Sequence, residues 1–236
     1  MAIDWQAFRL TIELAVVVSA ILVVVGLPLA YWIAFSRRRW KFLVEALVAL
    51  PIVLPPTVLG FYVLVALGSR SPLGRWWQAW TGHTLAFTFT GLVIGSILYS
   101  LPFAVQPFAA SFSSVDRKLL AASATLGASP LRTFFRIVVP LSVHGLVAGV
   151  ALAFAHTMGE FGVVLMVGGN IPGVTRTVSI GIYDQVQASN YASANAMALL
   201  LLVFCFGVLT LVYGLHRRTL HQATVNREVW AMGPVK

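Results

Sequence analysis

The chain has 236 residues, of which 59% are hydrophobic and only 10% are charged, and its formal net charge is +9. Soluble domains are roughly 25% charged, so a soluble fold of this length could not cover so much apolar surface. The basic residues lie in short clusters between apolar runs, which is typical of membrane proteins, and we expect no nucleic-acid partner. The length suits a single transmembrane domain over residues 1–236, with about five or six spans of roughly 20 residues each.

Five long apolar runs follow one another along the chain and predict transmembrane helices, because strands of a membrane barrel would alternate instead. The second run is interrupted by Pro51, Pro55 and Pro56. The single cysteine, Cys205, lies inside the last run and predicts neither a disulfide nor a metal site. The predicted spans are residues 10–35, 42–67, 85–110, 139–167 and 194–215.

The arginine and lysine counts of the connecting segments predict the orientation. Segments 36–41, 111–138 and 216–236 carry four basic residues each, twelve in all, whereas the other segments together carry four. Because short cytoplasmic loops are enriched in Lys and Arg, we expect the N-terminus outside and the C-terminus inside. Three tryptophans in the loop after the second run fit the outer membrane interface.

The cytoplasmic segment 111–138 contains two short helix signals separated by a glycine. Asp116 is a suitable N-cap, Gly127 a suitable helix end, and Ser129 followed by Pro130 a second start. Apolar side chains such as Leu131 follow on the cytoplasmic side. On the residues alone, this segment is either a docking element for a partner or an amphipathic linker on the membrane surface.

The spacing of small residues in this segment resembles the cytoplasmic signature of ABC importer permeases, which reads Glu-Ala-Ala, three residues, Gly, nine residues, then Ile-x-Leu-Pro. Here the match is Ala121-Ala122-Ser123, Gly127 and Ile137-Val138-Val139-Pro140. It departs from the signature at Ala121, Ser123 and Val139. Stretches 50–60, 153–162 and 170–177 are similar to the molybdate permease family.

The resemblance implies an all-α type I ABC importer permease, multi-pass in the bacterial inner membrane, that translocates molybdate into the cytoplasm; tungstate or sulfate/thiosulfate is the alternative substrate. It implies no catalytic residue, metal or cofactor in this chain, with ATP hydrolysis by a separate subunit. The implied partners are a second permease copy in a homodimer, cytoplasmic ABC ATPase subunits, a periplasmic oxyanion-binding protein and membrane lipid. The expected ATPase-docking residues are Ala121, Ala122, Gly127, Ala128, Ser129, Pro130, Leu131, Arg132 and Phe135.

A translocation pathway or gate is expected at Pro55, Pro56, Thr57, His156 and Glu160. Unwound backbone at mid-membrane must line a cavity or be buried in protein, and helix N-termini favour anions, although a simple packing kink would also explain the prolines. Glu160 is an acid deep in a span, where ionisable groups are functional candidates. It can be structural, a gate or dimer contact, or a ligand contact, and it can pair with His156 one turn earlier.

Two other classes of protein fit less well. An intramembrane enzyme would need a cluster of nucleophile, base or metal ligands, and His144, His156 and Glu160 fall short of that. An ion-driven secondary transporter would usually show internal repeats and more acids within its spans.

Overall fold

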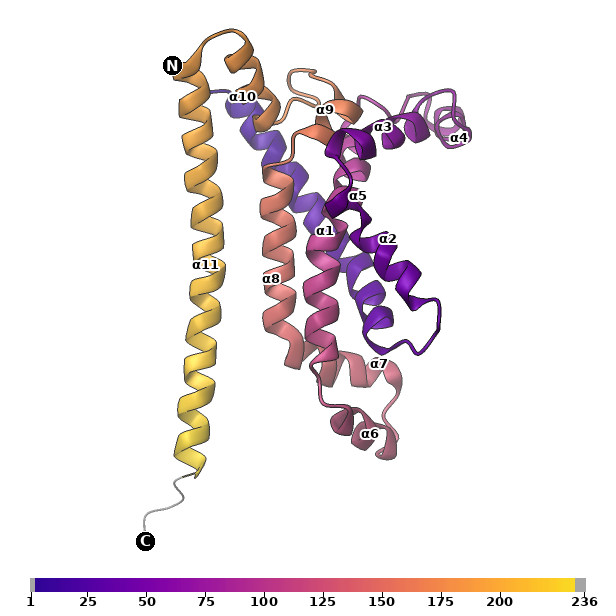
Figure 1. Cartoon of the computed structure of the whole chain (residues 1–236), viewed down its shortest axis with the longest axis vertical. Helices are drawn as coiled ribbons and strands as arrows, with labels where there is room; N and C mark the ends of the chain where they lie inside the picture. Colours follow the sequence, from indigo (N-terminus) through magenta and orange to yellow (C-terminus); the bar gives the residue numbers. More distant parts are fainter. Residues whose placement is uncertain (1–2, 232–236) are drawn as a thin grey trace.

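The computed structural model describes residues 3–231, and all the regular structure in that range is helical. Three long helices form the centre of the bundle (Figure 1): α1 (Trp5–Phe35), α5 (Phe89–Ser113) and α8 (Val139–Met158). Leu14 and Leu22 of α1 and Phe108 of α5 are fully buried there. Gly149 of α8 faces the Phe108 ring so closely that a side chain at this position would collide with it. The packing of these three helices therefore depends on shape, as in other membrane bundles.

Helix α1 covers the first predicted span, 10–35. It begins after Asp4, whose carboxylate accepts a hydrogen bond of 3.0 Å from the amide of Ala7, and it ends at Phe35, where the backbone becomes extended at Ser36. A side-chain acceptor at this position satisfies one of the amides that have no partner within the helix. The start lies five residues before the predicted one.

The second predicted span is two helices rather than one. Helix α2 (Lys41–Val53) and helix α3 (Pro56–Leu67) meet at an angle of 112°, with extended backbone at Leu54 and Pro55 between them. Proline has no amide proton and restricts the residue before it, so two successive prolines end a helix here. Among the described residues, four helical segments can span a membrane alone, or five if this bent pair is one span.

The predicted run 139–167 is also broken. Helix α8 ends at Met158, three residues follow, and the short helix α9 (Gly162–Gly168) begins after Phe161. A side chain on Gly162 would overlap Pro56 at the start of α3, and one on Gly60 would overlap Met166. Glycines are weak helix formers, and here they allow α9 to pack tightly against α3.

Helices α4 (Pro72–Thr81) and α10 (Val178–Gln187) lie at one end of the bundle, and the long α11 (Tyr191–Ala231) runs along its side (Figure 1). Helix α4 occupies the predicted tryptophan loop, and α10 precedes α11. Helix α11 contains the predicted fifth span, 194–215, and continues as helix through most of the predicted polar tail; residues 232–236 of that tail lie outside the described residues. The α1–α10 contact is fixed by a hydrogen bond of 2.9 Å from the Val178 amide to the Thr11 hydroxyl.

A polar cluster closes the end of the bundle near the N-terminus. The Arg176 side chain donates to Asn170 Oδ1 at 2.6 Å and lies 3.6 Å from a carboxylate oxygen of Asp184 and 4.0 Å from one of Asp4. The same Asp4 caps α1. The cluster therefore ties the 170–176 loop to the first turn of α1 and to α10.

Candidate functional site

Both helix breaks border one pocket of about 550 Å³. Pro56 and Thr57 come from the start of α3, His156 from the end of α8, and Glu160 from the break before α9. The structure thus brings together four of the five residues expected on the pathway. Pro55 is not among the pocket residues, although it precedes them directly as the N-cap of α3.

The first turn of α3 lines one side of this pocket with Pro56 and Thr57. Pro56 occupies the first helical position, where its missing amide proton costs nothing. The Thr57 amide follows, and at this position it has no acceptor within its own helix. The Thr57 amide and hydroxyl are therefore candidate donors for an oxyanion.

His156 is held by the facing helix α5 rather than by Glu160. Its Nδ1 lies 3.0 Å from the Ser100 hydroxyl, and its ring stacks on Phe103 at 3.8 Å between centroids. The Ser100 hydroxyl also lies 2.9 Å from the Thr157 hydroxyl, which donates to the Ala153 carbonyl. The alternative of a His156–Glu160 pair is not formed: neither Glu160 carboxyl oxygen has a hydrogen-bond partner.

Glu160 is only 3% exposed, and both of its carboxyl oxygens are buried. The Ser96 hydroxyl of α5 is likewise buried without a hydrogen-bond partner. Because the oxygens are inaccessible, the carboxyl group does not face the open volume of the pocket in this conformation. A buried acid without partners costs stability and supplies no bond that would fix the α8–α9 break, so the three alternatives for Glu160 stay predictions.

Three side chains of α5 at this site were not predicted: Tyr99 lines the pocket, and Ser100 and Phe103 contact His156. They lie with Ser96 on one face of α5, at the helical spacing i, i+3, i+4 and i+7. A polar stripe along an otherwise apolar span is a signal that sequence reasoning could have used.

Segment 111–138 contains two short helices, and their ends confirm the predicted caps. Helix α6 (Arg117–Thr125) begins at Asp116, whose carboxylate accepts from the Lys118 amide at 2.8 Å. It ends in a left-handed residue, Gly127, with φ of +74°. The Gly127 amide donates to Ala124 and the Ala128 amide to Ser123, both at 3.0 Å. This pair of bonds is a Schellman motif, which stops a helix at glycine.

The second short helix, α7 (Pro130–Thr133), starts at Ser129 as predicted, and the Ser129 hydroxyl accepts from the Arg132 amide at 3.3 Å. A π-helical turn, η1 (Phe134–Val138), joins α7 to α8. Helices α6 and α7 are locked together by a 2.5 Å hydrogen bond between the Ser123 and Thr133 hydroxyls. Ser123 is one of the departures from the importer signature, and the structure gives it this role.

The expected docking residues form the outer surface of this turn. All are exposed except Ala128, which is half-buried; they comprise Ala121, Ala122, Gly127, Ser129, Pro130, Leu131, Arg132 and Phe135. Leu126 and Leu131, which have 86% and 68% of their surface exposed, give the turn an apolar tip. An exposed apolar surface of this kind is typical of sites that contact another protein or the membrane.

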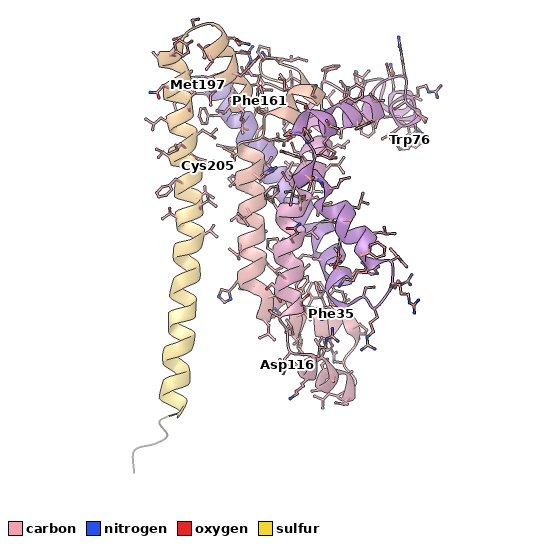
Figure 2. The ribbon with its side chains drawn as sticks, in the orientation of Figure 1. Phe35, Trp76, Asp116, Phe161, Met197 and Cys205 are labelled. Atoms are coloured by element: carbon pink, nitrogen blue, oxygen red, sulfur yellow. The ribbon has the colours of Figure 1, made fainter. Side chains whose placement is uncertain are left out.

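The pocket and the docking turn lie toward opposite ends of α8. Figure 2 shows Phe161, at the pocket, near the N-terminal end of the bundle, and Asp116, in the turn, at the other end. Helix α8 connects them through 20 residues, about 30 Å at 1.5 Å per residue. A movement of the turn can therefore reach the pocket through one continuous helix.

Comparison with known proteins agrees with this architecture. The model of the family "Binding-protein-dependent transport system inner membrane component" matches residues 26–221. The molybdenum transport system permease protein ModB of Azotobacter vinelandii is 50% identical over 91% of this chain and 95% of its own length. The Escherichia coli K12 ModB is 36% identical over 82% of this chain and 84% of its own length.

Solved structures share the fold at low sequence identity. An inward-facing MetNI methionine ABC transporter matches with a TM-score of 0.73 and 15% identity, over 92% of this chain and 95% of that one. A bacterial ABC transporter that imports alginate matches with a TM-score of 0.70 and 16% identity, over 90% and 78% of the two chains. The chain therefore belongs to the inner membrane components of binding-protein-dependent transport systems, and within them to the ModB permeases.

Proposed function

We propose that this chain forms the translocation pathway of an ATP-driven importer for molybdate. The observation that carries the proposal is the pocket in which Pro56, Thr57, His156 and Glu160 meet at two helix breaks, in a chain 50% identical to a molybdenum permease. Its volume of about 550 Å³ exceeds that of a small tetrahedral dianion and its first water shell. The Thr57 amide and hydroxyl are donors for such an anion.

The partners in this proposal are those that the importer architecture requires. A second copy of the chain faces the pocket across the pathway, a periplasmic protein delivers the anion, and ATPase subunits bind the α6–α7 turn. The exposed tip at Leu126 and Leu131 supports the last contact. The chain translocates the anion and leaves ATP hydrolysis to those subunits.

Coupling in this scheme is mechanical. ATP-driven closure of the two ATPase subunits moves the α6–α7 turns toward each other, and α8 carries the movement to the break at Gly159. Because α8 is continuous from Val139 to Met158, a tilt of its cytoplasmic end must shift His156 and the wall of the pocket. The α6–α7 turns thus have two arrangements, apart and close together, and nucleotide binding favours the second.

Uptake in cells tests the substrate. Deleting the gene in its host should abolish high-affinity uptake of radiolabelled molybdate and spare phosphate uptake, and a plasmid copy should restore it. Tungstate competition should reduce the restored uptake, because the two dianions have the same shape and charge. Loss of sulfate uptake with molybdate uptake intact would instead assign the chain to sulfate or thiosulfate.

A further inference from the structure

Helix α4, which the transport scheme leaves unused, has one uncovered apolar face. Leu73, Trp76 and Trp80 follow one another at helical spacing and are 49%, 57% and 79% exposed. The Trp76 and Trp80 rings lie 6.0 Å apart between centroids. Arg75 and Gln78 lie on the opposite side of the same helix and are also exposed. The helix is therefore amphipathic, with aromatic residues concentrated on its free apolar side.

The place of α4 in the fold points to one occupant of that face. Figure 1 shows α3 and α4 extending sideways from the bundle, at the end where α1 begins and where α5 starts. Long apolar helices that cross a bilayer end at this level, so α4 lies at the depth of the lipid headgroups. Tryptophan favours this boundary, because its ring is apolar and its N–H group is polar.

The charges around α4 fit phospholipid as well. Arg75 lies on the polar face, and Arg70 lines a hollow of about 380 Å³ between the end of α3 and residues 84–87. With α4 at headgroup depth, both arginines can bind lipid phosphate, because guanidinium binds phosphate through paired N–H donors. An apolar face beside cationic groups is the pattern of helices that rest in a membrane surface.

Helix α4 cannot swing freely away from this position, because it is fixed to α3. The Ser71 hydroxyl donates to the Ala66 carbonyl at 2.5 Å and accepts from the Gly74 amide at 2.8 Å. Gly74 lies against the Gly68 backbone, where any side chain would collide with the carbonyl. Trp77 packs on the cluster that contains Val63 and Leu67 of α3. The depth of α4 therefore sets the depth of α3.

We infer that α4 lies in the headgroup layer of the membrane, with Leu73, Trp76 and Trp80 in the acyl boundary, and holds α3 at that depth. On the proposed orientation this is the outer leaflet. The other end of α3 carries Pro56 and Thr57, so one wall of the pocket is anchored to lipid. The wall contributed by α8 is the one that the cytoplasmic turn can move.

Collision measurements on spin labels test the inference. Four single-cysteine variants are made in a Cys205→Ser background: Trp76→Cys and Trp80→Cys on the apolar face, and Arg75→Cys and Gln78→Cys as matched controls one or two residues away. Each full-length chain is labelled with a nitroxide and reconstituted with its ATPase subunits in vesicles of phosphatidylethanolamine and phosphatidylglycerol. Collision rates are then measured with oxygen, which concentrates in lipid, and with a neutral nickel chelate, which stays in water.

The expected result is opposite behaviour of the two faces. Labels at positions 76 and 80 should collide several-fold more with oxygen than with nickel, at a depth of about 5–10 Å below the phosphates, and labels at 75 and 78 should show the reverse ratio. Strong nickel collisions at all four positions would place α4 in water, and low rates with both reagents at 76 and 80 would show that protein covers the face. Either result overturns the inference. The assay needs no substrate, so its outcome is independent of the molybdate assignment.

Discussion

Replacing Gly127 with valine should weaken the association of the ATPase. Gly127 has φ of +74°, and no atom lies within 4 Å of the position that a Cβ would take. The cost is therefore conformational rather than a collision with neighbouring atoms. A left-handed residue with a Cβ costs roughly 1–2 kcal/mol, and a β-branched side chain belongs at the upper end of that range.

The strain in Gly127→Val lowers the affinity for the ATPase, because the free turn can relax and the docked turn cannot. In the absence of the ATPase, the end of α6 can fray and release the two hydrogen bonds of the Schellman motif. Docking requires the native angle between α6 and α7, so the cost of about 1–2 kcal/mol is subtracted from the binding free energy. The dissociation constant should rise roughly 5–30-fold.

Two further variants separate this effect from general damage. Gly127→Asn should bind within a few-fold of the wild type, because asparagine tolerates the left-handed region. Gly82→Val is the matched control: Gly82 ends α4 with φ of +76°, also has no atom within 4 Å of the added Cβ, and lies far from the turn. It should carry the same strain and bind the ATPase normally.

The assay is titration of labelled ATPase subunits onto the chain in lipid nanodiscs, followed by stimulation of ATP hydrolysis with loaded binding protein. Wild-type affinity and stimulation in Gly127→Val would remove the α6–α7 turn from the coupling path. Failure of this variant to insert into the membrane would show that the turn is a folding element instead.

Three further predictions address the turn, the buried acid and the orientation. Ser123→Ala should weaken ATPase binding by about 1 kcal/mol, because the hydrogen bond to Thr133 is lost. In a double-mutant cycle of ATPase affinity, adding Thr133→Val should weaken binding little further. Additive losses would contradict a shared hydrogen bond. Glu160→Gln should fold and retain uptake within a few-fold, because the buried carboxyl oxygens have no partner that requires a charge, whereas complete loss of uptake would show that the charge is needed. In a Cys205→Ser background, a membrane-impermeant thiol reagent should label cysteine at exposed Gly82 from the periplasm and at exposed Ser114 only from the cytoplasm; the reverse pattern would invert the proposed orientation.

Local signals made the α6–α7 turn predictable from the sequence. Asp116, Gly127 and Ser129 act through bonds to amides and carbonyls within a few residues of them. Such bonds depend little on the rest of the fold, so the caps were predicted at the right residues. The same holds for the end of the first span at Phe35, where a polar and basic segment follows directly.

The geometry of the pocket depends on contacts between distant segments and could not be predicted in the same way. The prolines indicated a break near Pro55, but the angle of 112° is set by the packing of α9 on α3. The possible pair of His156 and Glu160 assumed one continuous helix. The helix ends between them at Met158, so the i, i+4 relation is lost, and Ser100, 56 residues away in the sequence, becomes the partner of His156.

Transport by purified components tests the central claim most directly. The chain is reconstituted with its ATPase subunits in proteoliposomes. ATP is enclosed in the lumen, where it reaches the copies whose ATPase subunits face inward. Binding protein loaded with molybdate is added outside. We predict that radiolabelled molybdate accumulates against its gradient and that this accumulation requires both ATP and the binding protein. Excess unlabelled molybdate should suppress the accumulation, and excess phosphate should not. Accumulation that persists without ATP or without the binding protein, or the absence of molybdate accumulation while another oxyanion is taken up, would contradict the account.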